Sequence, residues 1–274
     1  MDKTQRLKKY WRVCTFGICF SMFGIGGLLM SYLWFPLARL FIREQEPLEA
    51  FCQRSVSFMF RWFTHLMCAL GAIKVEHKSI KQLNNQQGCI IVANHPSLID
   101  VILIIGQLPQ CDCIVKAELW DNSFVRHVVS MAGYIPNSSE QLLDICQHKL
   151  AKGRKLLVFP EGTRTKPGQA LDCQRGAAQL AVRCQAPIQT ARINCIPATL
   201  YKGLPWYKVP DSIPVFSLEV DAPVRIDNFV SEAPSPSTAA RRLTRFFNAV
   251  LDPNRNQQNI TLEDYSCAKL ATRD

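Results

Sequence analysis

An uncharged apolar run near the start of the chain limits what the 274 residues can fold into. Residues 13–38 contain no Asp, Glu, Lys or Arg. A helix of this length would be roughly 39 Å long, which exceeds the ~30 Å hydrocarbon core of a bilayer. No small-residue cleavage pattern follows the run. We therefore expect it to enter a membrane as an uncleaved anchor rather than to be removed as a signal peptide.

The orientation of this anchor depends on two observations that conflict. Five basic residues and one acidic residue lie within residues 1–12, which favours the cytoplasmic side for this end. The twelve scattered cysteines favour a reducing, cytoplasm-like compartment for the rest of the chain. A single crossing cannot satisfy both. Either the run bends at its glycines and Pro36 within one leaflet, or a second segment brings the chain back.

Residues 55–73 form a suitable second segment. Their polar side chains recur at helical spacing and large aromatic residues lie between them, which is typical of an amphipathic helix at a membrane interface. The alternative is a helix that docks on the soluble part of the chain through its aromatic residues. In either case we expect an N-terminal membrane anchor over 1–70, with the apolar segment at 13–38 and the amphipathic helix at 55–70.

From about residue 71 the pattern changes to β-rich runs that alternate with helical periods. The runs lie at 72–77, 88–95, 111–119, 155–162, 193–201 and 217–226. This order predicts an α/β fold, with a mixed sheet flanked by helices and an N-terminal membrane-associated helical segment. We assign this domain to 71–252 and a loosely held tail to 253–274.

Three helix boundaries can be predicted within this domain. Ser138 and Gln141 form a capping box that predicts a helix start, and Gly153 predicts its end. A polar loop is expected over 231–242, followed by a helix over 241–251. The cysteines form no CxxC pair and no cluster with histidine, so a zinc site is not expected.

Asn94, His95 and Asp100 form a polar group between two apolar stretches. Pro96 suits the first position of a helix, which would put His95 at the N-cap and Asp100 in the second turn. Because helical side chains lean toward the N-terminus, Asp100 could then reach the imidazole and make it a stronger base. Backbone N–H groups at the helix start would stabilise an oxyanion. The plainer reading is a histidine that only caps a helix.

A second polar stretch follows the apolar run that ends at Phe159. It carries Glu161, Arg164 and Lys166 before a Pro-Gly turn at 167–168. The planar guanidinium of Arg164 can bind a phosphate, and Glu161 could accept a hydrogen bond from a substrate hydroxyl. A solvated charged loop is the alternative interpretation.

NHPSLID at 94–100 and FPEGTR at 159–164 together resemble signature motifs of the glycerophospholipid acyltransferases of the 1-acylglycerol-3-phosphate acyltransferase type. The resemblance covers roughly residues 70–200. It implies that His95 is a general base oriented by Asp100. It also implies acyl transfer from a thioester to a glycerol hydroxyl without an acyl-enzyme intermediate.

The same resemblance assigns the substrate-binding residues. Glu161, Gly162, Thr163 and Arg164 would form the acceptor site, and VKAEL at 115–119 resembles an element that makes Lys116 a second phosphate contact. CIPATL at 195–200 resembles the fourth motif, and QRGAAQLA at 174–181 resembles the helix after the third.

The second motif departs from the family pattern. In the family it usually ends in an Asp-Arg pair, whereas the aligned stretch GYIPNSS at 133–139 has no arginine. The phosphate of an acceptor would then be held by Lys116 and Arg164 at most. We expect 1-acylglycerol-3-phosphate as the acceptor, and another lyso-lipid remains open.

The implied partners are the lipid bilayer, the lysophospholipid and an anionic donor, either acyl-CoA or acyl carrier protein. The formal net charge of +10 suits all three. No cofactor, metal or nucleic-acid partner is expected, and the catalytic domain should lie on the cytoplasmic face. Three alternatives remain: a transacylase that needs no thioester, a non-catalytic membrane adaptor, and a hydrolase using Ser97, although the chain has no GxSxG elbow.

Overall fold

The computed structural model describes residues 3–122, 125–231 and 233–253 and divides into two compact units. The first unit takes the chain up to Glu76, together with Ser97–Leu142 and Cys195–Ser217. The second takes His77–Pro96, Leu143–Asn194 and the chain from Leu218 onward. The N-terminal helices thus share a unit with two later segments. The expected tail falls almost entirely outside the described residues.

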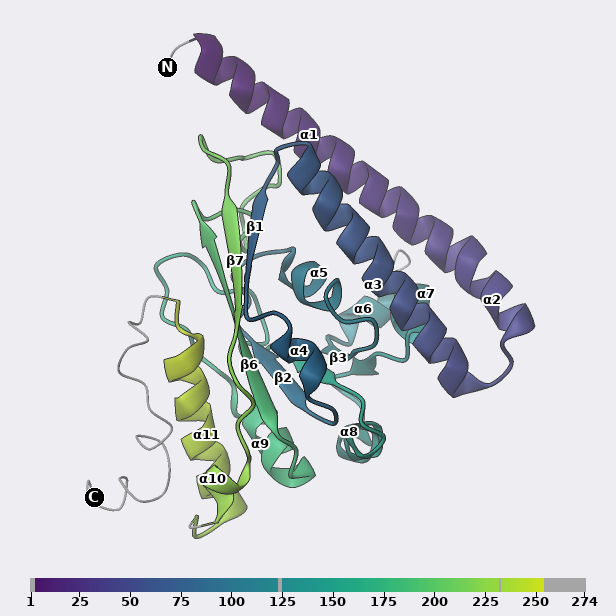
Figure 1. Cartoon of the computed structure of the whole chain (residues 1–274), viewed down its shortest axis with the longest axis vertical. Coiled ribbons are helices and arrows are strands. Elements are labelled where there is room, and N and C mark those ends of the chain that lie inside the picture. Colours follow the sequence, from purple (N-terminus) through teal and green to yellow (C-terminus); the bar gives the residue numbers. More distant parts are fainter. Residues whose placement is uncertain (1–2, 123–124, 232, 254–274) are drawn as a thin grey trace. The chain divides into compact units, whose positions relative to one another are not determined.

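The first unit begins with a long helical rod. It consists of α1 (Lys3–Leu29), a π-helical turn (Met30–Trp34) and α2 (Phe35–Phe41). Figure 1 shows that the rod continues through its glycines and Pro36 without folding back on itself. Helix α3 (Gln45–Ala69) then returns beside the rod. The rod therefore does not bend back at its glycines and Pro36, and α3 is the segment that returns along it.

Aromatic side chains hold α3 against the rod. The ring of Phe63 on α3 lies 6.0 Å from that of Phe20 and 4.8 Å from that of Phe23, measured between centroids. Further along, the indole N–H of Trp34 donates to the Ser55 hydroxyl at 3.2 Å. Close packing of this kind associates helices in lipid as well as in water, because it does not depend on excluding water.

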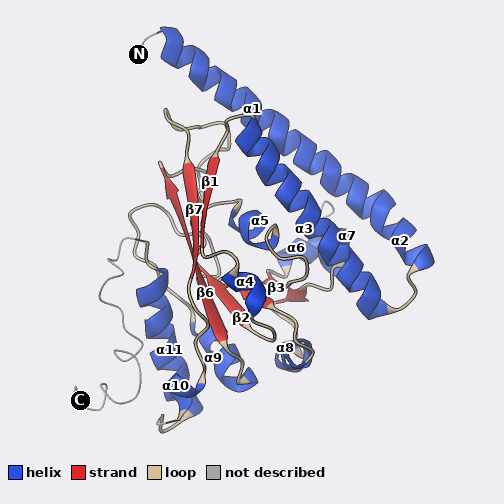
Figure 2. Cartoon of the chain, viewed as in Figure 1, coloured by secondary structure: helices blue, strands red, loops and turns tan. Residues whose placement is uncertain are grey.

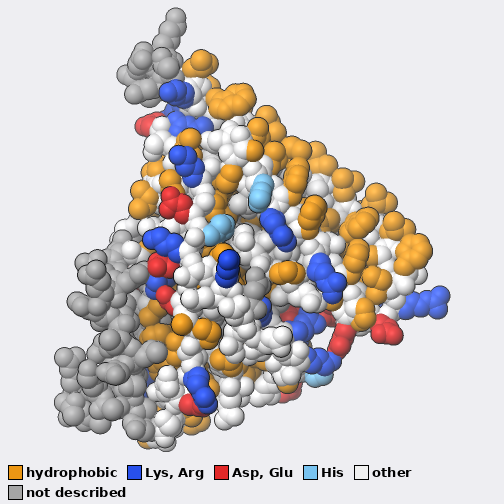
Figure 3. Space-filling model, in the orientation of Figure 1, with side chains coloured by type: hydrophobic (Ala, Val, Ile, Leu, Met, Phe, Trp, Pro, Cys, Tyr) orange, Lys and Arg blue, Asp and Glu red, His pale blue; other side chains and the backbone are white. Residues whose placement is uncertain are grey.

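The outer face of the rod is apolar and exposed. Figure 3 shows hydrophobic side chains along its whole length. The larger ones on α1 include Trp11, Ile18, Met22, Ile25 and Leu29. Leu7–Phe41, with a mean hydropathy of 1.9, is long and apolar enough to cross a membrane by length and composition. The expected apolar anchor is therefore a surface helix rather than a core helix.

Further helices of the first unit pack on α3. Helices α5 (Asp100–Ile105) and α7 (Arg126–Met131) contact α3. A short helix, α6 (Glu118–Asp121), precedes α7. Strand β3 (Asp112–Val115) pairs in parallel with β4 (Ile135–Pro136). The sequence did not predict β4, which has only two residues.

The second unit is built on parallel strands. β2 (Ile90–Ala93) pairs with β5 (Leu156–Val158) on one side and with β6 (Ile188–Ile196) on the other. An antiparallel bridge between Ile188 and Val224 makes the pairing mixed. β1 (Lys74–Lys78) and β7 (Val215–Val220) each run through a boundary between the units.

Helices flank these strands. α9 (Arg175–Cys184), α10 (Asp227–Val230) and α11 (Pro236–Leu251) lie on one side of β6 and β7 (Figure 2). α4 (Gln82–Asn85) precedes β2, and α8 (Leu142–Ala151) precedes β5. The predicted α/β class, with a mixed sheet flanked by helices, is confirmed.

Two helix starts differ from the prediction. α8 begins at Leu142, so Ser138 does not cap it, although its predicted end at Gly153 is correct and that residue has a φ of +77°. α11 begins at Pro236 and not within 241–251, because the Ser235 side chain caps it by accepting from the Thr238 N–H at 3.2 Å. The expected loop over 231–242 is therefore partly helix.

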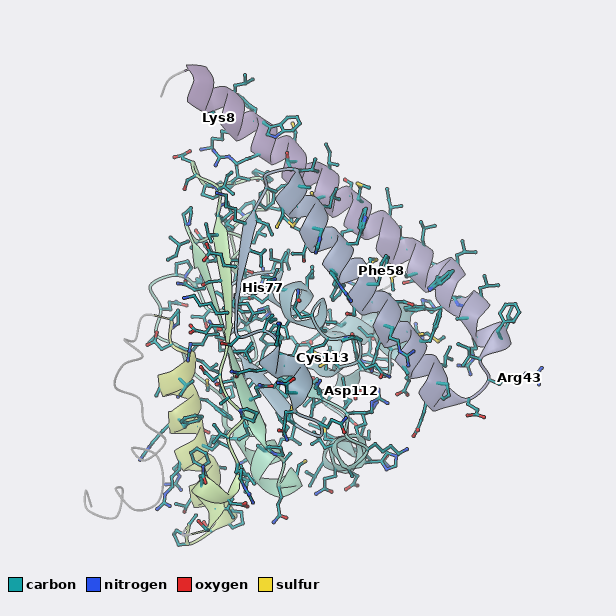
Figure 4. All side chains as sticks on the ribbon, viewed as in Figure 1. Lys8, Arg43, Phe58, His77, Asp112 and Cys113 are labelled. Carbon is teal, nitrogen blue, oxygen red and sulfur yellow. The ribbon has the colours of Figure 1, made fainter. Side chains whose placement is uncertain are left out.

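Replacing Phe63 by alanine should loosen the helix pair. Phe63 is 1% exposed and loses its contacts with two rings, so we expect a loss of about 3 kcal/mol or more in the free energy of unfolding. Thermal unfolding in detergent would measure it. Phe58, on the same helix, is 68% exposed and provides the matched control (Figure 4). Equal effects of Phe63→Ala and Phe58→Ala would contradict the packing described above.

Candidate active site

Two signature residues follow neighbouring parallel strands of the second unit. His95 lies just beyond the end of β2, and Glu161 lies just beyond the end of β5. Because the carboxyl ends of parallel strands lie at the same edge of a sheet, the two residues come together there, where α/β proteins bind ligands. The pairing of Val92 with Val158 sets this register.

The Glu161 carboxylate binds the backbone at His95. Its Oε1 accepts a hydrogen bond from the His95 backbone N–H at 2.6 Å, and its Oε2 accepts one from the Thr165 hydroxyl. The Thr165 N–H in turn donates to the His95 carbonyl at 3.1 Å. The imidazole lies against the ring of Phe159, with centroids 4.5 Å apart. The half-buried imidazole of His95 is thus held through its own backbone and by a neighbouring ring.

Asn94 anchors the residue before the histidine. Its side-chain amide donates to the Ile193 carbonyl at 2.8 Å, and its oxygen accepts from the Ile193 N–H at 2.7 Å. These bonds continue the parallel pairing of β2 and β6 beyond the last strand residue. The sequence had placed Asn94 in the polar group without a role, and the structure makes it a positioning residue for His95.

The remaining residues of the FPEGTR motif lie on the turn after β5. Gly162 has a φ of +64°, a conformation that side chains with a Cβ adopt at a cost. It is exposed, whereas Thr163 and Arg164 are half-buried. Thr163 and Arg164 therefore lie on the same loop as Glu161, which is where the sequence predicted the acceptor site.

Asp100 lies in the first unit and binds the turn before it. Its Oδ2 accepts from the Ser97 backbone N–H at 2.6 Å, and its Oδ1 accepts from the Ser97 hydroxyl. Both residues are fully buried. Because its hydroxyl donates to a carboxylate, Ser97 has the setting of a turn residue and not of an activated nucleophile.

The predicted helix start in this motif is wrong. α5 begins at Asp100, so Pro96 does not open the helix and Asp100 is not in the second turn. The amides that were expected to face an oxyanion have other partners: Ser97 N–H donates to Asp100, and Leu98 N–H donates to the Leu200 carbonyl at 3.0 Å. A tight turn, closed by the short polar side chains, replaces the first helical turn.

Lys116 follows β3 in the first unit and is exposed. Asn137 brackets the segment that carries it. The Asn137 N–H donates to the Val115 carbonyl at 2.9 Å, and its side-chain oxygen accepts from the Ala117 N–H at 3.1 Å. Asn137 lies in the stretch that lacks the arginine of the second motif, and here it positions the backbone on both sides of Lys116.

Two cysteines close to the acidic residues are not nucleophiles. Burial, and to a lesser extent the charge of Asp100, raise the pKa of the Cys195 thiol to about 12. Burial, followed by the charges of Glu161 and Asp172, raises the pKa of the Cys173 thiol to about 12. Both thiols therefore stay protonated at neutral pH, and neither can form an acyl-enzyme as a thiolate.

The structure brings together part of the predicted site. His95 and the residues Glu161–Arg164 share one loop cluster in the second unit, while Asp100 and Lys116 belong to the first. Among the described residues, no group of three His, Cys, Asp or Glu side chains could hold a metal ion. The roles of Asn94, Asn137 and Thr165 were not predicted, although Asn94 and Asn137 lie within motif stretches and Thr165 directly follows one.

Comparison with known proteins gives the class. Residues 74–194 match the protein-family model Acyltransferase. By fold, the chain is similar to a 1-acyl-sn-glycerophosphate (LPA) acyltransferase of Thermotoga maritima, with a TM-score of 0.64 and 19% identity over 88% of this chain and 95% of that one. This second likeness concerns the fold. Residues 74–194 are an acyltransferase domain.

Curated relatives are similar to the chain over the same region. A 1-acyl-sn-glycerol-3-phosphate acyltransferase of Helicobacter pylori is 38% identical over 128 residues, covering 43% of this chain and 54% of that protein. The human alpha enzyme is 32% identical over 127 residues, covering 43% and 45%. Over this domain the chain is therefore similar in sequence to 1-acyl-sn-glycerol-3-phosphate acyltransferases. It spans about half the length of the curated relatives it matches.

Removing the Glu161 carboxylate should disorder the backbone at His95. We expect Glu161→Ala to lower the free energy of unfolding by about 2 kcal/mol, because a buried amide loses a charged acceptor. Thr165→Val removes only the contact at Oε2 and should cost less. Thermal unfolding of the two variants beside the wild-type chain would test this, and an equal or larger loss for Thr165→Val would contradict it.

Proposed function

We propose that this chain is a membrane-associated acyltransferase that moves a fatty acyl group from a thioester donor to the free hydroxyl of a lysophospholipid, with 1-acylglycerol-3-phosphate as the expected acceptor. The observation that carries the proposal is the hydrogen bond between Glu161 of the FPEGTR motif and the backbone of His95. It joins the two signature motifs of the family in one place. The relatives named for this reaction support the same class.

The proposed mechanism uses His95 as a general base. Its imidazole takes the proton of the acceptor hydroxyl as the oxygen attacks the thioester carbonyl. The tetrahedral intermediate then collapses, the C–S bond breaks, and the imidazolium returns the proton to the leaving thiolate. Asp100 would orient the imidazole and stabilise its charged form. Positioned proton transfer contributes roughly 10²- to 10⁴-fold in rate.

The acceptor phosphate would be bound by Lys116 and Arg164. Arg164 can offer a planar pair of donors, and Lys116 offers a compact charge. The arginine of the second motif is absent, so these two side chains would carry more of the discrimination between phosphate-bearing and other lyso-lipids. The donor would be acyl-CoA or acyl carrier protein, both of which are anionic and suit a basic chain.

The apolar rod gives the membrane association its physical basis. The donor chain and the acceptor both partition into a leaflet, so an enzyme that joins them has to lie at its surface. We propose that the rod and α3 anchor the chain, with the catalytic domain on the cytoplasmic face. The basic residues at the N-terminal end of the rod support this orientation. All eleven cysteines in the described part of the chain are free, which also fits a reducing compartment.

Loss of the His95 imidazole should abolish transfer. With purified, detergent-solubilised protein, labelled acyl-CoA or acyl carrier protein, and a panel of lyso-lipids, we expect transfer by the wild-type chain. His95→Ala should reduce the rate by about 10²-fold or more. His148→Ala is the matched control, because this histidine lies exposed on α8.

The same assay separates the alternatives. A transacylase would transfer acyl chains between phospholipids with no added thioester, and a hydrolase would release fatty acid with no acceptor present. If neither donor supports transfer to any acceptor above background, the acyltransferase activity would be contradicted. A non-catalytic membrane adaptor would then be favoured.

Lys116 should affect acceptor affinity more than turnover. We expect Lys116→Ala to lower kcat/KM for a lysophosphatidic acid acceptor by about tenfold, mainly through KM, because one charged phosphate contact is lost. Asn137→Ala should give a smaller loss of the same kind by releasing the backbone around Lys116. Steady-state kinetics would show this. An unchanged KM in both variants would exclude Lys116 from the phosphate site.

A further inference from the structure

A groove lies at the N-terminal end of the rod. It is about 880 Å³ in volume and lies within the first unit. One wall is the beginning of α1, and the other comprises the end of α3 and the loop before β7, with Leu70 and Ile213 facing the space. Its size falls within the range of small-molecule and lipid pockets. Neither signature motif contributes a residue to it.

The apolar wall of the groove continues into the exposed face of the rod. Leu7, Trp11 and Cys14 line the groove and are spaced like residues on one face of a helix. Ile18 and Met22 extend this face along α1, and both are exposed. The groove therefore lies at the polar N-terminal end of the exposed apolar surface that we propose lies in the membrane. A ligand in it could have its apolar part among the lipid chains.

Basic side chains surround the same end of the groove. Lys8 and Arg12 line it, and Figure 4 shows Lys8 near the start of α1. One acidic residue, Asp211, also lines it, but Asp211 forms an ion pair with Lys9 at 3.2 Å. Lys8 and Arg12 thus leave the groove with a net positive charge. A groove with apolar walls and a cationic rim is complementary to an anionic amphiphile.

Arg12 provides an independent observation, because one of its hydrogen-bond donors has no acceptor within the described part of the chain. It is 7% exposed, and one of its terminal nitrogens donates to the Asp211 backbone carbonyl. Its Nε is buried and has no hydrogen-bond partner among the described residues. A buried guanidinium donor without an acceptor costs free energy. A phosphate oxygen entering the groove would supply the acceptor after a small adjustment of the side chain.

We propose that this groove binds an anionic phospholipid of the bilayer, with its phosphate at Lys8 and Arg12 and the upper part of an acyl chain against Leu7, Trp11 and Ile213. The bound lipid holds the N-terminal end of α1 at the level of the headgroups, where Trp and Lys side chains are favoured. The site is separate from the acceptor site. The inference rests on the proposed membrane association but not on acyl transfer.

Quenching of Trp11 fluorescence by brominated lipid tests this site. Trp11 is 60% exposed on the groove wall, and the difference between the wild-type chain and Trp11→Phe isolates its signal. The full chain is reconstituted into vesicles with a fixed minor fraction of brominated phosphatidylglycerol or of brominated phosphatidylcholine. We expect quenching of Trp11 to be about fivefold stronger with the anionic lipid at equal fraction.

Charge variants link the selectivity to the groove. Lys8→Gln should remove most of this preference, while Lys81→Gln, at an exposed position before α4, should leave it unchanged. Arg12→Lys keeps the charge and should retain part of the preference. A thermal unfolding midpoint for each variant identifies any that fails to fold, and Lys8 is exposed, so its replacement should not affect folding.

The outcomes separate this inference from the function proposed above. Equal quenching by both lipids, or a preference that Lys8→Gln leaves intact, would contradict the anionic-lipid site while membrane association stands. No quenching by either lipid would contradict both the site and the membrane association of the rod. Because no acyl transfer is measured, a failed transferase assay has no bearing on the result.

Discussion

The side-chain amide nitrogen of Gln53 on α3 donates to the Asp112 carboxylate at 3.0 Å and to the Ala132 carbonyl at 2.8 Å. Gln53, Asp112 and Ala132 are all buried in the first unit. A buried polar group that loses its hydrogen-bond partner costs about 1–3 kcal/mol. On its other side, α3 buries Phe63 against the rod. One helix therefore joins the apolar surface to β3 and to α5, which begins with Asp100. The positions of the rod and of Asp100 are linked through it.

The two acidic residues of the signature motifs have similar roles on either side of Pro96. Glu161 accepts from the His95 N–H within the second unit, and Asp100 accepts from the Ser97 N–H within the first. Pro96 between them has no backbone N–H, so both backbone donors in the stretch from His95 to Ser97 have acceptors. The backbone N–H groups around His95 therefore have acceptors within the protein. Both carboxylates fix the path of the chain on either side of Pro96.

The sequence predicted the parts of the fold whose apolar pattern is simple. The rod, β2 and β5 follow from continuous apolar runs. β6 begins at Ile188, whereas the sequence predicted a β-rich run from 193. Polar residues near the start of β6 interrupt its apolar pattern. Arg192 and Thr190 are buried there, and both bond to Asp221, which is distant in sequence. Helix starts were missed because caps are side-chain contacts, which an apolar pattern does not reveal. At Ser97–Asp100, a turn provides acceptors for the backbone N–H groups without a helix.

Asn137 has a structural role in the stretch that departs from the family pattern. An arginine in this motif would bring a positive charge, whereas Asn137 brings only an amide, which binds the backbone at Val115 and Ala117. Lys116 lies between these two residues and is exposed. Its backbone is held on both sides while its side chain remains free to extend, and its long stem tolerates acceptors of different size. With Arg164, such a site would bind phosphate through one planar fork and one flexible point charge, with no second fork. It would therefore discriminate less sharply among lyso-lipid headgroups than a site that has the arginine.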